Sequence, residues 1–162
     1  ISRVHEEAGL SDAGTTLVVA IVPIGGDRAV VGNVGDSRVY AYERTDDGGT
    51  IDQVTTDQSM VQEMVNEGEL KPDEAADHPM SHVLAQAIGT ADDLSVDTYQ
   101  RPVPDRLLAC SDGLTAELSD DKIATHLTTA SAEDCCTALI KAANEADGSD
   151  NISVGIIVSG GG

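Results

Sequence analysis

The hydrophobic pattern of the chain is strand-like at first, helix-like in the middle and mixed towards the end. Four β-branched or aliphatic runs separated by turn residues open it, at residues 15–22, 29–34, 38–42 and 50–54. Short apolar runs bounded by Gly, Pro and Asp are typical of strands joined by hairpins. We therefore expect a meander of four antiparallel strands in the first third of the chain.

Helical spacing follows in the middle of the chain. Ser59 and Gln62 form a capping box in front of a helical apolar pattern, which predicts a helix from Ser59 to Gly68. Pro72 at a first helical position predicts a second short helix. Apolar residues within 78–89 predict a further helical turn or two. Three short helices are thus expected to interrupt a β-rich chain.

The rest of the chain mixes strand and helix signals. The remaining predicted elements are strands at 94–99, 106–110 and 152–158, a short helix at 120–127, a long helix from Ser131 to near Gly148, and a flexible tail at 159–162. Because strands and helices do not alternate regularly, we expect an α+β fold and not a doubly wound sheet. No repeat or long linker marks a boundary, so residues 1–162 are expected to form a single domain.

The composition sets the kind of core. A chain of 162 residues with 40% hydrophobic residues can bury one, and because it contains neither Phe nor Trp that core must consist mainly of small aliphatic side chains. Cys110, Cys135 and Cys136 are odd in number and show no C-x-x-C spacing, which disfavours a disulfide framework or a zinc site. We expect them to be buried, reduced thiols.

The charge of the chain is strongly negative. It carries 29 acidic residues against 9 basic ones, a formal net charge of −20. Self-repulsion of this size penalises the compact state at low ionic strength and is screened by salt, so we hypothesise adaptation to high salt. Nucleic acid and anionic membranes are excluded as partners, since both require a basic face. Without an apolar run of about 18 residues or a signal peptide, the expected location is the cytoplasm.

Three acidic motifs carry the candidate chemistry. Gly35-Asp36-Ser37, Ser111-Asp112-Gly113 and Ser149-Asp150-Asn151 each place an Asp at a predicted strand end or turn. Hard divalent cations such as Mg²⁺ and Mn²⁺ prefer oxygen ligands, and carboxylates from distant segments bind one ion only if the fold brings their loops together. Any one of these motifs alone is most often a simple turn, because Asp and Gly are common turn residues.

The flanking sequence makes the series more specific. The motifs stand in unbroken order from about Gly14 to Val158: Gly14-Thr15-Thr16, Gly35-Asp36-Ser37-Arg38, Thr55-Thr56-Asp57-Gln58-Ser59, His78-Pro79, Gln86-Ala87-Ile88-Gly89, Cys110-Ser111-Asp112-Gly113 and Asp150-Asn151. This series resembles the metal-dependent serine/threonine protein phosphatases of the type 2C or PPM family, most of all the bacterial and archaeal single-domain members. The resemblance implies an antiparallel β-sandwich flanked by helices, and hydrolysis of phosphoserine and phosphothreonine by a metal-activated water.

The resemblance also implies roles for individual residues. Asp112 and Asp150 match two carboxylates that hold the core metal pair of Mn²⁺ or Mg²⁺ ions, and Asp36 matches the Asp that helps to bind a further ion. Two or three ions are thus implied for the complete domain. Asn151 is expected to orient its loop and not to bind metal. His78 and His82 lie in the segment that resembles the mobile flap beside the active site. Neither receives a role, and no catalytic side chain is assigned.

Part of the family pattern is missing from the sequence. Family members carry an Asp-Gly-x-Gly-Gly motif and a phosphate-binding Arg upstream of the Gly-Thr-Thr strand, and neither occurs here. We therefore expect a domain incomplete at its N-terminus, with a weak metal site and little activity of its own. The expected partner is a phosphoprotein substrate of a serine/threonine kinase, and the expected state is a monomer. Two alternatives stay open: a non-catalytic phosphatase-like remnant acting in protein interaction, and an acidic module that binds calcium.

Overall fold

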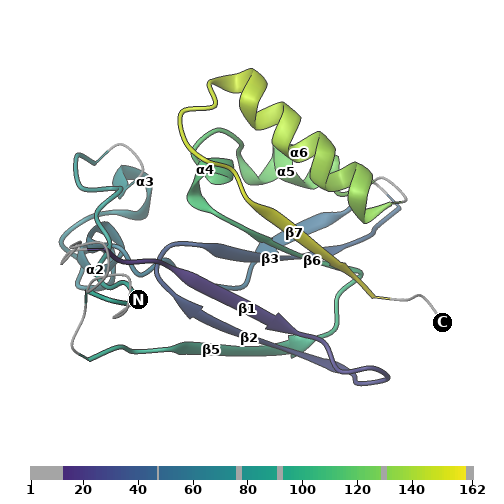
Figure 1. The fold of residues 1–162 in the computed structure, drawn as a ribbon, viewed down its shortest axis with the longest axis horizontal. Coiled ribbons are helices and arrows are strands. Elements are labelled where there is room, and N and C mark those ends of the chain that lie inside the picture. Colours follow the sequence, from purple (N-terminus) through teal and green to yellow (C-terminus); the bar gives the residue numbers. More distant parts are fainter. Residues whose placement is uncertain (1–12, 47, 76–77, 91–92, 129–130, 160–162) are drawn as a thin grey trace.

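Two antiparallel sheets stack face to face in the computed structural model, which describes residues 13–46, 48–75, 78–90, 93–128 and 131–159 (Figure 1). The three-stranded sheet has the order β1 (Leu17–Ile21), β2 (Arg28–Val34), β5 (Asp97–Pro102). The four-stranded sheet has the order β4 (Thr50–Gln53), β3 (Arg38–Glu43), β6 (Arg106–Cys110), β7 (Val154–Val158). The α+β sandwich expected from the resemblance is confirmed.

The helices lie in two groups. Helices α4 (Asp112–Thr115), α5 (Asp120–His126) and α6 (Ala132–Ala146) cover the outer face of the four-stranded sheet, whereas α2 (Met60–Asn66) and α3 (Pro72–Ala75) lie beyond one end of the sheets (Figure 1). Both predicted N-caps form, since the Ser59 hydroxyl accepts from the Gln62 N–H and the Ser131 hydroxyl from the Asp134 N–H. The Gln62 side chain donates to Asn66 Oδ1, so only the hydroxyl half of the predicted capping box is seen among the described residues. None of the helices in the described ranges is long and apolar enough to span a membrane.

Two apolar cores hold these layers together. The core between the sheets is built from small aliphatic residues: Ala29, Val31, Val39, Ala41 and Leu107. The core between the four-stranded sheet and the helices is larger, and centres on Tyr40, Tyr42, Leu108, Leu114, Ile123, Leu127 and Leu139. Cys110 and Cys135 are buried thiols outside any disulfide, as predicted, but Cys136 is only half-buried. Small aliphatic side chains are therefore sufficient for the inter-sheet layer, while tyrosines fill the wider space beneath the helices.

The predicted meander is wrong. β1 pairs with β2 and β3 with β4, as hairpins should, but β2 and β3 belong to different sheets. The second partner of each strand comes from later in the chain: β5 pairs with β2, and β6 pairs with β3. At Gly35 the backbone adopts a φ of +102°, and this turn carries the chain from one sheet to the other.

Three further predictions need correction. Residues 78–89 form turns and not a helix, because Leu84 and Ile88 make isolated β-bridges with Ser59 and Thr15. The strand predicted at 94–99 starts at Asp97, where pairing with β2 begins. Ser159 is held, since its N–H and hydroxyl both donate to the Asp105 carbonyl, while the rest of the predicted tail lies outside the described residues.

The outer face of the three-stranded sheet is apolar along β1. Leu17, Val19 and Ile21 are 50%, 44% and 57% exposed, and they alternate with inward-facing residues of the same strand. In the described part of the chain no helix packs on this face (Figure 1). Both faces of β1 are thus apolar, although only one is covered.

Candidate metal centre

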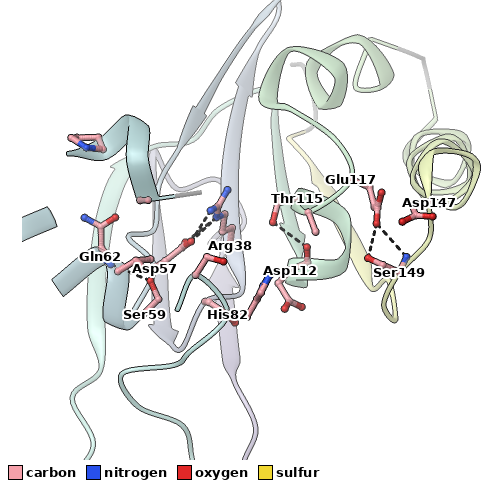
Figure 2. Close-up of a pocket in the computed structure, with 16 residues that line it drawn as sticks. Arg38, Asp57, Ser59, Gln62, His82, Asp112, Thr115, Glu117, Asp147 and Ser149 are labelled. Carbon is pink, nitrogen blue, oxygen red and sulfur yellow. Dashed lines mark hydrogen bonds and ion pairs between the residues drawn. The ribbon is translucent and has the colours of Figure 1, made fainter. Parts of the chain in front are cut away.

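A cavity of about 660 Å³ lies between the loops at one end of the sandwich and the segment that contains α2 and α3. Asp36, from the β2–β3 turn, and Asp112, from the start of α4, both line it. Figure 2 shows Asp112 between the Arg38–Asp57 pair on one side and Glu117 with Ser149 on the other. Most charged side chains of the lining are acidic: Asp36, Asp57, Asp112, Glu117 and Asp147. A wall of this kind attracts cations and repels a free phosphate.

The turn that carries Asp36 is held from several sides. The Gly35 N–H donates to Gln58 Oε1 at 2.7 Å, and the Gly35 carbonyl accepts from Asn33 Nδ2 at 3.0 Å. The hydroxyls of Thr16 and Ser37 lie 2.9 Å apart on the other side. A Cβ added at Gly35 would overlap the Thr16 side chain, so both the positive φ and the close packing require glycine.

Asp112 follows directly from the buried strand β6. Its Oδ1 accepts from the Gly113 N–H at 2.9 Å, and its carbonyl accepts from the Thr115 hydroxyl at 3.2 Å. Both contacts are within the first turn of α4, and the bond from the Gly113 N–H orients the carboxylate just after the strand leaves the sheet. A buried strand feeding a one-turn helix thus explains why this Asp faces the cavity.

The loop that carries Asp150 packs against the backbone next to Asp112, but Asp150 is not one of the residues that line the cavity. The Ser111 hydroxyl donates to the Asn151 carbonyl at 3.2 Å and accepts from the Ser153 N–H at 3.0 Å, which joins the two loops. Asp150 Oδ1 accepts from the Asn151 N–H at 2.6 Å, and the Asp150 side chain is exposed. The structure therefore brings the Asp112 and Asp150 loops together, and separately brings Asp36 and Asp112 to one cavity.

The electrostatics of the cavity fit a cation. Burial raises the pKa of Asp36, and the nearby charge of Asp112 raises it further. Two carboxylates that repel each other are stabilised when a hard divalent ion is placed between them. Among the residues that the structure describes, however, no three His, Cys, Asp or Glu side chains form a metal-binding cluster. Asp36 and Asp112 are two candidate ligands on the cavity wall, and the metal-binding role of all three aspartates stays a prediction.

Several lining residues were not singled out by sequence reasoning. Arg38 and Asp57 received no role, although both belong to motifs of the resemblance. Arg38 Nε donates to Asp57 Oδ1 at 2.9 Å and to Oδ2 at 3.1 Å, and a second guanidinium nitrogen donates to Oδ2 at 2.6 Å. Glu117 accepts from the N–H and hydroxyl of Ser149, and these hydrogen bonds lower its pKa. Nothing in the sequence marked Glu117, since its partner lies 32 residues away.

His78 and His82 differ in position. His82 lines the cavity, whereas His78 Nδ1 accepts from the Met80 N–H at 3.2 Å within a local turn. Asn151 contacts the neighbouring loop through its backbone carbonyl. The expected role of Asn151 in orienting the loop therefore stays a prediction for its side chain.

Comparison with known proteins gives one family. Residues 2–151 match the family model of protein phosphatase 2C. The serine/threonine phosphatase stp of Listeria welshimeri serovar 6b is 36% identical over 153 residues, covering 93% of this chain and 58% of the relative. Protein phosphatase PhpP of Streptococcus pneumoniae is 34% identical over 161 residues, covering 97% of this chain and 63% of the relative. The chain thus spans less than two thirds of the length of these relatives.

Solved structures agree with this result. The serine/threonine phosphatase Stp1 from Staphylococcus aureus superposes with a TM-score of 0.85 at 32% identity, covering 99% of this chain and 62% of that one. The catalytic domain of the serine/threonine protein phosphatase PstP, in complex with two manganese ions, superposes with a TM-score of 0.77 at 30% identity, covering 96% and 62%. The sandwich and its flanking helices are therefore shared with phosphatases of known structure.

Proposed function

This chain belongs to the protein phosphatase 2C family, and from that premise we propose that it is the larger part of a metal-dependent phosphatase acting on phosphoserine and phosphothreonine in proteins. Stp of Listeria welshimeri and Stp1 of Staphylococcus aureus are named serine/threonine phosphatases, and PhpP is named a protein phosphatase. These names favour an enzyme over a non-catalytic remnant. The observation that carries the proposal is the position of Asp36 and Asp112 in one acidic cavity, with the Asp150 loop bonded alongside.

The cavity needs a cation before it can accept a phosphate ester. Bound Mn²⁺ or Mg²⁺, two or three ions in the complete domain, would neutralise the phosphate charge and lower the pKa of an attacking water. Asp36 and Asp112 would hold these ions from the cavity wall, and Asp150 from the adjacent loop. Arg38 also lines the cavity, but its guanidinium donates three hydrogen bonds to Asp57, which favours a structural role for it.

We further propose the finer assignments that the sequence suggested. The protein acts as a monomer in the cytoplasm and is adapted to high salt. Its substrates are phosphoproteins of a serine/threonine kinase. The net charge of −20 supports both the salt adaptation and the absence of nucleic acid as a partner.

The test is Mn²⁺-dependent hydrolysis of a phosphothreonine peptide by the protein that the complete gene encodes, in molar KCl. Asp112→Asn is expected to lower kcat/KM about 100-fold or more, beyond the 10- to 100-fold typical of outer-shell groups. Asp27→Asn is the matched control, since Asp27 is an exposed aspartate on the β1–β2 hairpin, and it should leave the rate unchanged.

Three results would point elsewhere. Equal turnover by the unaltered protein and Asp112→Asn would contradict the proposed site. No turnover by either would favour the remnant, and binding of calcium in preference to manganese would favour the calcium module. The 162-residue chain alone is expected to hydrolyse the peptide slowly, because its described residues form no three-ligand cluster. Robust activity of this chain would refute that part of the proposal.

A further inference from the structure

The side chain of Gln58 connects the turn before Asp36 to the start of β5. Gln58 Oε1 accepts from the Gly35 N–H at 2.7 Å, and Gln58 Nε2 donates to Asp97 Oδ2 at 2.8 Å. The orientation of the amide is therefore fixed, because its oxygen needs a donor and its nitrogen an acceptor. Sequence reasoning gave Gln58 no role, although it lies within a motif of the resemblance.

The backbone of Gln58 strengthens the same connection. Its N–H donates to the Gly35 carbonyl at 3.1 Å, so Gln58 bonds both backbone groups of Gly35. Its carbonyl accepts from the Ala85 N–H at 2.9 Å, which ties in the turn segment around the Ser59–Leu84 bridge. One residue thus holds the Asp36 turn against two other parts of the molecule.

The neighbouring residue holds the other side of the turn. Asp57 binds the guanidinium of Arg38, two residues after Asp36, while Gln58 binds Gly35, one residue before it. Residues on both sides of Asp36 are therefore bonded to consecutive positions of one segment. Because that segment is joined to β5 through Asp97, the backbone of the Asp36 turn is held in place relative to the sandwich.

We propose that Gln58 is a positioning residue that holds the Asp36 turn and so sets the affinity of the Asp36–Asp112 pair for a divalent cation. The part of this inference that concerns cation affinity rests on the proposed function. The part that concerns the position of the turn follows from the hydrogen bonds of Gln58 alone. Without the amide, the Gly35 N–H loses its acceptor, and the turn gains freedom at a residue whose φ of +102° already lies outside the common regions.

The experiment compares Gln58→Met with Gln86→Met in the protein that the complete gene encodes. Methionine has nearly the length of glutamine but neither hydrogen-bonding atom. Gln86 is the matched control, because its amide also makes two hydrogen bonds, to the N–H and carbonyl of Ser95, and neither of them reaches residues 35–37. Gln58 Nε2 meets the same Ser95 carbonyl only at 3.5 Å, so its main partners differ from those of Gln86. Binding of Mn²⁺ is measured by titration calorimetry, and amide hydrogen exchange of residues 35–37 by mass spectrometry in EDTA.

Gln58→Met is expected to weaken Mn²⁺ binding about tenfold, the lower range for outer-shell groups, and to speed exchange in residues 35–37 about fivefold. Gln86→Met should change neither. The double variant Gln58→Glu with Asp97→Asn should restore slow exchange. In that variant the new carboxylate at position 58 can accept from both the Gly35 N–H and the new amide at position 97.

The two measurements separate the two proposals. Exchange of residues 35–37 that is unchanged in Gln58→Met, or equally fast in Gln86→Met, would overturn the positioning role. Fast exchange with unchanged Mn²⁺ affinity would overturn its link to the cation. No Mn²⁺ binding by the unaltered protein from the complete gene would instead count against the metal site of the proposed function and against that link. The exchange measurement would still decide whether Gln58 holds the turn.

Discussion

Replacing Gly113 by alanine sets two opposite effects against each other. Gly113 is in α4, where alanine normally stabilises a helix by about 1 kcal/mol relative to glycine. A Cβ at Gly113, however, would lie 2.5 Å from the Asn151 carbonyl oxygen and 3.1 Å from its carbonyl carbon. Both neighbours are backbone atoms, which cannot rotate away as a flexible side chain can.

The contact should outweigh the helix propensity. Overpacking in a well-packed region costs about 1–3 kcal/mol, and the helix propensity of alanine offsets about 1 kcal/mol of it, so the net loss of stability is expected to be up to about 2 kcal/mol. The strain is relieved only if the Asp150–Asn151 loop moves away from α4. That movement would separate Asp112 from Asp150, so Gly113→Ala should also weaken Mn²⁺ binding.

Urea unfolding followed by circular dichroism measures the first effect, and titration calorimetry the second. Gly155→Ala is the control, since a Cβ at this strand glycine meets nothing within 4 Å, and we expect no loss of stability there. The reasoning is refuted if Gly113→Ala is as stable as the unaltered chain and binds Mn²⁺ with the same affinity.

Three other predictions concern the aspartate turn and the charge. Folding raises the pKa of Asp36 above its ordinary 3.8, so the stability of the protein falls as pH rises through the raised pKa. Asp36→Asn should therefore raise the Tm in EDTA at neutral pH but not below about pH 3.8. An equal change of Tm at both pH values would contradict this. Gly35→Ala should cost about 2–5 kcal/mol in urea unfolding, from its positive φ and overlap with Thr16, against about 1–2 for Gly25→Ala, which has open space; equal losses would show that the overlap is relieved. Molar KCl should raise the Tm by screening the net charge of −20, and a flat Tm would remove the salt-adaptation hypothesis.

Local signals predicted local structure well. The helix after Ser131 was found because its cap and its apolar period both lie within the helix itself. Strand β6 was found to the residue, since a buried strand needs only a continuous apolar run. Residues 83–89 carry a similar apolar pattern, but there the backbone pairs with distant segments instead of with itself. Apolar spacing alone does not distinguish these cases in a short segment.

Non-local pairing was out of reach. Besides β1, strand β2 pairs with β5, and this pairing places Asn33 opposite Asp97. No feature of either sequence segment encodes that register. The same limit applies to the site. The three aspartates were chosen because their motifs resemble a family, whereas the role of Gln58 depends on a hydrogen bond across 23 residues that leaves no periodic mark in the sequence.

The uncovered stripe on β1 has a consequence for handling the protein. Leu17, Val19 and Ile21 share one face of a strand at the edge of its sheet, a combination that favours self-association. In dilute buffer the acidic charge keeps copies apart, but at 1 M salt the Debye length shrinks to about 3 Å and that colloidal protection is lost. Solubility and stability are therefore expected to respond to salt in opposite directions.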